Sequence, residues 1–76
     1  MVWQTYLVIY FGTKGAKPSE IIKRVEALGF VTTLGTVDFV YIWESKPTKE
    51  QVIELADKLT ESLRETGCVF NIDTHD

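Results

Sequence analysis

The 76-residue chain is predicted to fold as a single α+β domain, residues 1–76, and three observations support this fold class. Short runs rich in β-branched and aromatic residues are bounded by glycine and proline, as β-strands commonly are. Two longer segments place their apolar residues at helical spacing instead. These segments follow one another in the order strand, helix, strand, strand, helix, strand. A chain of this length has a small core, so a further apolar surface tends to be covered by a partner.

The first strand and the first helix are expected before residue 30. Residues 4–11 (QTYLVIYF) form a β-rich run, which Gly12 closes. Pro18 suits the first position of a helix, where a backbone N–H is not needed. The apolar stripe of this helix consists of Ile21, Ile22, Val25 and Leu28. Gly29 is expected to end the helix, because glycine readily adopts the left-handed conformation that follows a last turn.

The second and third strands are expected to form a hairpin. Residues 30–34 (FVTTL) and 37–44 (VDFVYIWE) are β-rich runs, and Gly35 and Thr36 lie between them. A short glycine-containing turn between two such runs is typical of antiparallel strands.

The second helix has a clear start signal. Thr48 and Gln51 match a capping box, in which each side chain binds the backbone N–H of the other residue. The helix is therefore expected to begin at about Lys49 and to end at Thr66 and Gly67. Its apolar stripe consists of Val52, Leu55, Ala56, Leu59 and Leu63.

The element order predicts the topology of the sheet. Residues 68–72 (CVFNI) form a short last strand, and the polar residues 73–76 are expected to form a tail without fixed structure. The resulting βαββαβ order is the split βαβ pattern of the ferredoxin-like two-layer sandwich. Its four-stranded antiparallel sheet has the strand order 4-1-3-2, with both helices on one face. The other face of the sheet has no helix to cover it.

Strand alternation assigns side chains to the two faces. The preferred assignment places four aliphatic side chains of the central strands against the helices: Leu7, Ile9, Val40 and Ile42. The helix-free face then carries Tyr6, Val8, Tyr10, Phe39, Tyr41 and Trp43. The reverse assignment of the third strand stays open.

The helix-free face is expected to be a self-association surface. Under either assignment the central strands are apolar on both faces, whereas a solvated face should alternate apolar with polar residues. A second copy of the chain, packed by two-fold symmetry, covers such a face with the same residues on both sides. The alternative is a monomer in which Trp3 and the terminal tail fold over the face. The favoured function is thus a non-enzymatic interaction or binding module that forms a homodimer.

Binding of single-stranded nucleic acid or of a nucleotide is the first alternative function. Exposed aromatic rings on the central strands of such a sheet can stack on bases. Lys14, Gly15 and Lys17 precede a helix start and form a candidate anion-binding loop, although a plain solvated loop explains them too. Eight Lys and Arg against eleven Asp and Glu give a formal charge of -3, which disfavours attraction to phosphates.

Other classes of site have little support in the sequence. A lone Cys68 rules out an intramolecular disulfide and leaves zinc without a set of ligands. Asp38, Glu44 and Asp73 are interpreted as solvated charges, and His75 as part of the tail, so no catalytic residue, metal or cofactor is expected. No apolar run is long enough for a membrane span, and the protein is expected to be cytoplasmic.

Residues 6–10 (YLVIY), residues 27–30 (ALGF) and the following hairpin resemble the small CRISPR-associated ferredoxin-like nuclease family and its SinR-like relatives. The resemblance implies dimerisation through the open sheet faces. It also implies an acidic metal ligand directly after the first-strand tyrosine, near the dimer axis. Phe11 occupies that position and cannot bind a divalent cation. The dimer geometry is therefore expected to carry over and the nuclease chemistry is not, which leaves a divergent hydrolase as the second alternative.

Overall fold

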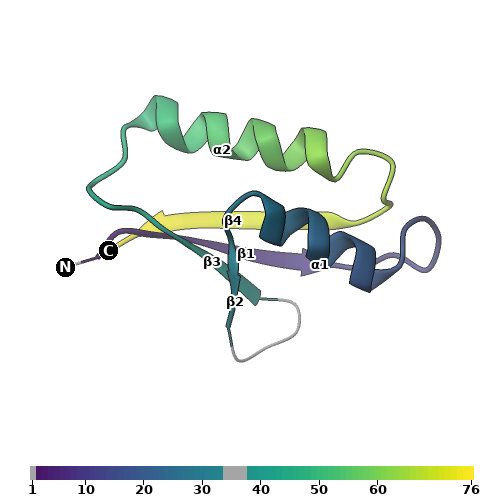
Figure 1. The fold of residues 1–76 in the computed structure, drawn as a ribbon. Helices are drawn as coiled ribbons and strands as arrows, with labels where there is room; N and C mark the ends of the chain where they lie inside the picture. The colour runs from purple at the N-terminus through teal and green to yellow at the C-terminus, as the bar shows by residue number, and fades with distance from the viewer. Residues whose placement is uncertain (1, 34–37) are drawn as a thin grey trace.

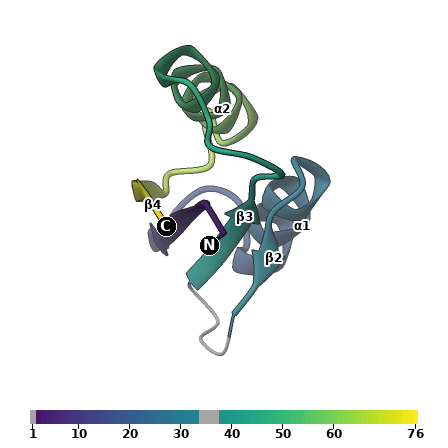
Figure 2. The same ribbon diagram turned by 90° about the vertical axis from the view of Figure 1, so that its left-hand side faces the viewer.

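The computed structural model, which describes residues 2–33 and 38–76, confirms the predicted α+β fold and element order. The elements are β1 (Gln4–Tyr10), α1 (Pro18–Ala27), β2 (Val31–Thr32), β3 (Asp38–Ile42), α2 (Lys49–Ser62) and β4 (Val69–His75). They form one antiparallel sheet in the order β2-β3-β1-β4, which is the predicted order (Figure 1). Figure 2 shows both helices on the same side of this sheet.

The core lies between the sheet and the two helices. β1 is one of the two central strands, and its Leu7 is paired with Phe39 of β3 on one side and Ile72 of β4 on the other. The buried cluster consists of Leu7, Ile9, Ile21, Val25, Phe30, Phe39, Leu55, Leu59 and Leu63. Each helix thus turns its predicted apolar stripe toward the same face of the sheet.

The ends of α1 agree with the local signals in the sequence. Pro18 is its first residue, and Ile21 and Val25 are its buried residues. Gly29 follows the last turn with a φ of 104°, which is the left-handed conformation that favours glycine.

The start of α2 is the predicted capping box. The Thr48 hydroxyl accepts from the N–H of Gln51 at 3.1 Å, and the Gln51 side chain accepts from the N–H of Thr48 at 2.8 Å. The helix ends at Ser62, a few residues before the predicted end at Thr66 and Gly67. The reason is a tight turn in which the buried Thr66 hydroxyl donates to the carbonyl of Leu63 at 2.6 Å.

β2 and β3 are shorter than predicted, and the predicted turn at Gly35 and Thr36 lies outside the described residues. The prediction of a tail without fixed structure is wrong, because β4 continues through Thr74 to His75. These residues pair with the start of β1, where the hydroxyls of Thr5 and Thr74 lie 2.7 Å apart. Pairing with a central strand gives their backbone N–H and C=O groups the partners that a free tail lacks.

The preferred assignment of the faces of β3 is wrong, and the reverse assignment is correct. Phe39 is 0% exposed and belongs to the core, while Tyr41 and Trp43 pack against it from the same face. Val40 and Ile42 therefore lie on the helix-free face. The physical reason is that the helix side offers more than apolar contact: the indole N–H of Trp43 donates to the buried Thr5 hydroxyl at 2.8 Å. An indole N–H usually finds such a partner when its ring is buried.

Candidate functional site

The helix-free face of the sheet carries a continuous set of apolar side chains from all four strands. We define this open-face patch as Tyr6, Val8, Tyr10, Val31, Val40, Ile42 and Val69. Pairing brings these side chains together: Tyr6 lies opposite Val40, Val40 opposite Val31, and Tyr10 opposite Val69. Of the predicted self-association residues, Tyr6, Val8 and Tyr10 belong to this patch, whereas Phe39, Tyr41 and Trp43 lie on the opposite side of the sheet.

Most of the open-face patch is exposed, apart from half-buried Val8 and from Val40, which is 9% exposed. In the described part of the chain seven large hydrophobic residues are exposed, and five of them belong to the patch: Tyr6, Tyr10, Val31, Ile42 and Val69. Their exposed fractions, 38% to 64%, correspond to roughly 500 Å² for side chains of ordinary size, near the upper end of the largest patches on monomers. A typical protein interface covers about 800 Å² on each partner.

Polar residues lie along one side of the open-face patch. His75 stacks on the ring of Tyr6, with ring centroids 4.8 Å apart and planes 15° apart. Its Nε2 lies 3.7 Å from an oxygen of Asp73. The prediction of a tail overlooked a signal for this arrangement, because the alternation of Val69, Asn71 and Asp73 continues without a break to His75.

The predicted anion-binding loop is packed against the turn after α2. Gly15 has a φ of 98°, and the N–H of Ala16 donates to the carbonyl of Thr66 at 3.2 Å. A Cβ at Gly12 would lie 2.7 Å from the carbonyl oxygen of Gly67, so glycine is needed for this close approach of two backbones. Lys14 and Lys17 are both exposed. The close packing of the two backbones thus accounts for the glycines of this loop. Anion binding by Lys14, Gly15 and Lys17 stays a prediction.

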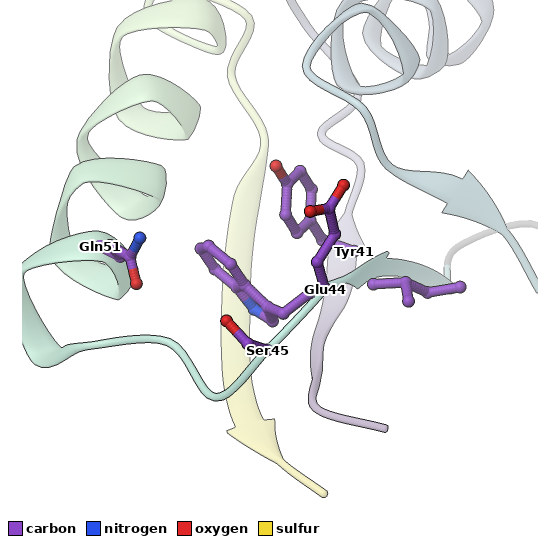
Figure 3. Close-up of a pocket in the computed structure, with 6 residues that line it drawn as sticks. Tyr41, Glu44, Ser45 and Gln51 are labelled. Carbon is purple, nitrogen blue, oxygen red and sulfur yellow. The ribbon is translucent and has the colours of Figure 1, made fainter. Parts of the chain in front are cut away.

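Tyr41 of β3 and Trp43, directly after the strand, line a cleft on the helix side of the sheet. Tyr41 and Trp43 are half-buried, with ring centroids 4.8 Å apart and planes 59° apart. The cleft has a volume of about 310 Å³ and is lined by Tyr41, Ile42, Trp43, Glu44, Ser45 and Gln51 (Figure 3). A second hollow of about 210 Å³ shares Tyr41, Trp43 and Gln51 and extends along α2 to Lys58. The sequence did not predict this cleft, because the preferred assignment placed Tyr41 and Trp43 on the helix-free face.

The remaining candidates stand apart from these two surfaces. Cys68 is half-buried, and its sulfur lies 3.1 Å from the Thr66 hydroxyl. Phe11 packs against the core. Among residues 2–33 and 38–76, no three His, Cys, Asp or Glu side chains come together where they could hold a metal.

Within the same residues no helix is long and apolar enough to span a bilayer.

No protein-family model matches the chain, and no curated protein or solved structure matches it at a significant level. The open-face patch and the cleft are therefore the features from which a function can be argued.

Proposed function

We propose that this protein is a self-associating interaction module in which two copies pack their open faces together about a two-fold axis. The observation that carries the proposal is the exposure of the open-face patch on the central strands, where a solvated sheet would alternate with polar residues. A two-fold dimer covers the same patch on both copies at once.

The size of the face fits this partner. The exposed apolar side chains supply roughly 500 Å², and a standard interface needs about 800 Å² on each side. Half-buried Val8 and the surrounding polar side chains supply further area, namely Gln4, Asp38, Asn71 and Asp73. An apolar centre inside a polar rim is the usual anatomy of a protein interface.

The charge of the face favours a protein partner over a nucleic acid. No Lys or Arg occupies a paired strand position on this side of the sheet, and its acidic residues are Asp38 and Asp73. Phosphate contacts depend on such cations. β3 offers Val40 and Ile42 here rather than the aromatic rings that would stack on bases. The two exposed tyrosines of β1, Tyr6 and Tyr10, suit a protein interface, where tyrosine is enriched.

The resemblance of residues 6–10 and 27–30 to the CRISPR-associated ferredoxin-like nuclease family fits the same proposal, because that family dimerises through its open sheet faces. Phe11 in place of the acidic ligand separates the proposed association from the family's nuclease chemistry.

Light scattering and sedimentation velocity on matched variants test the proposal. Tyr10→Asp places a carboxylate within the open-face patch, where its burial without a partner is unfavourable. Ile53→Asp is the control, because Ile53 is 49% exposed and lies on α2, away from the open face. We expect dimers for the wild type and for Ile53→Asp, and monomers for Tyr10→Asp with an unchanged circular dichroism spectrum. A monomeric wild type at high concentration, or a dimeric Tyr10→Asp variant, refutes the proposal.

A further inference from the structure

The cleft between β3 and α2 has a floor made of two aromatic side chains, Tyr41 and Trp43. The apolar residues of α2 leave this floor partly exposed. Tyr41 and Trp43 pack against the core on the helix side of the sheet, yet both are only partly buried. The helix residues that line the hollow above them include Gln51, Glu54 and Lys58. These three residues share one face of α2, at spacings of three and four. Polar groups thus converge over two half-buried rings, as they do in small-molecule sites.

Both rings are held in place by contacts outside the cleft. The indole N–H of Trp43 donates to Thr5, which in turn pairs with Thr74. Tyr41 meets Phe30 edge to face, with ring centroids 5.4 Å apart. A floor fixed in this way loses little conformational entropy when a ligand binds.

The charge on the walls of the cleft is negative. Glu44 enters from the end of β3 and has no ion-pair partner among the described residues. Glu54 and Lys58 lie 3.5 Å apart and largely offset one another. The faces of aromatic rings are also negative, so a cation over Tyr41 and Trp43 is attracted both by the rings and by Glu44. An anionic ligand would be repelled by the same rings and by Glu44.

We propose that this cleft binds a small organic cation of the methylated ammonium class, with Tyr41 and Trp43 as its floor and Glu44 as its counter-charge. A volume of about 310 Å³ is at the lower end of ligand pockets and suits a free small molecule. The site has its aromatic floor on the opposite side of the sheet from the open-face patch and shares only Ile42 with it. It therefore stands or falls independently of the proposed self-association.

Choline titration tests the proposal, with 3,3-dimethylbutan-1-ol as an uncharged ligand of nearly the same shape. Tryptophan fluorescence is read in a Trp3→Phe background, in which Trp43 is the only indole. Nitrogen–proton correlation spectra of the wild type locate the site through the indole of Trp43 and the side-chain amide of Gln51. We expect saturable choline binding, weakened about 2- to 30-fold for the uncharged ligand, the range that a cation over a ring contributes.

Two charge variants distinguish the effect of the Glu44 charge in the cleft from the effect of the net charge of the protein. Glu44→Gln should weaken choline binding several-fold. Glu26→Gln removes the same charge from the exposed face of α1 and should leave binding unchanged. The proposal is overturned by the absence of saturation, by equal affinity for the uncharged ligand, or by equal effects of the two variants.

Discussion

Thr5 offers the sharpest test of how the sheet is organised, because its buried hydroxyl joins three strands. It accepts from the indole N–H of Trp43, directly after β3, at 2.8 Å, and it lies 2.7 Å from the hydroxyl of Thr74 on β4. Its side chain is 0% exposed. Thr5→Val keeps the shape and the β-branch of the side chain and removes both hydrogen bonds.

The expected loss of stability follows from these two contacts. Each hydrogen bond contributes about 0.5–1.5 kcal/mol, and a buried donor left without a partner adds to the loss. The new methyl group returns about 0.8 kcal/mol of hydrophobic burial. The free energy of unfolding should therefore fall by about 1–2 kcal/mol. For a domain of this size, that change corresponds to a melting temperature lower by about 5–15 °C.

Urea unfolding followed by circular dichroism measures this change at one fixed protein concentration. Thr60→Val is the matched control, because its exposed hydroxyl donates only to the carbonyl of Ala56 within α2. A double-mutant cycle with Thr74→Val separates the two contacts of Thr5. Equal losses for Thr5→Val and Thr60→Val would show that the Trp43–Thr5–Thr74 chain does not stabilise the sheet, and would remove the reason given for the orientation of β3.

Three further results are expected from thermal or urea unfolding. Phe39→Ala should lower the free energy of unfolding by about 3–5 kcal/mol, because the ring is fully buried. A loss below about 1 kcal/mol would show that Phe39 lies on the open face instead. Deletion of residues 73–76 should cost at least about 1–2 kcal/mol, since it removes strand pairing and the Thr5–Thr74 contact; an unaffected protein would mean that these residues form a free tail. Gly15→Ala should cost about 1–3 kcal/mol, because its φ of 98° and the nearby carbonyl of Thr66 leave no room for a Cβ, and a neutral result would contradict that packing.

The parts of the fold that depend on local signals could be predicted from the sequence. Pro18 and Gly29 mark the two ends of α1, and Thr48 with Gln51 marks the start of α2. These residues act on backbone groups a few positions away, so no knowledge of the tertiary structure is needed. The element order then limits the sheet to the topology that is observed.

The facing of β3 depends on a contact that local patterns do not contain. Both of its alternating sets are apolar, so hydrophobicity alone cannot choose between them. Thr5 held the missing signal: it shares the core-facing parity of Leu7 and Ile9, and a hydroxyl in that position needs a hydrogen-bonding partner. Trp43 supplies the donor, and its orientation fixes the remainder of the strand.

The corrected facing of β3 divides one predicted aromatic surface into two chemically different ones. Val40, which is 9% exposed, and Ile42, which is 56% exposed, lie on the open face, whereas Tyr41 and Trp43 form the floor of the cleft on the helix side. Because successive side chains of a strand point to opposite faces, a substitution in one surface can leave the other intact. Tyr10→Asp should therefore abolish the dimer and preserve choline binding, and Glu44→Gln should weaken choline binding and preserve the dimer. Loss of both properties in either variant would mean that a single surface serves both functions.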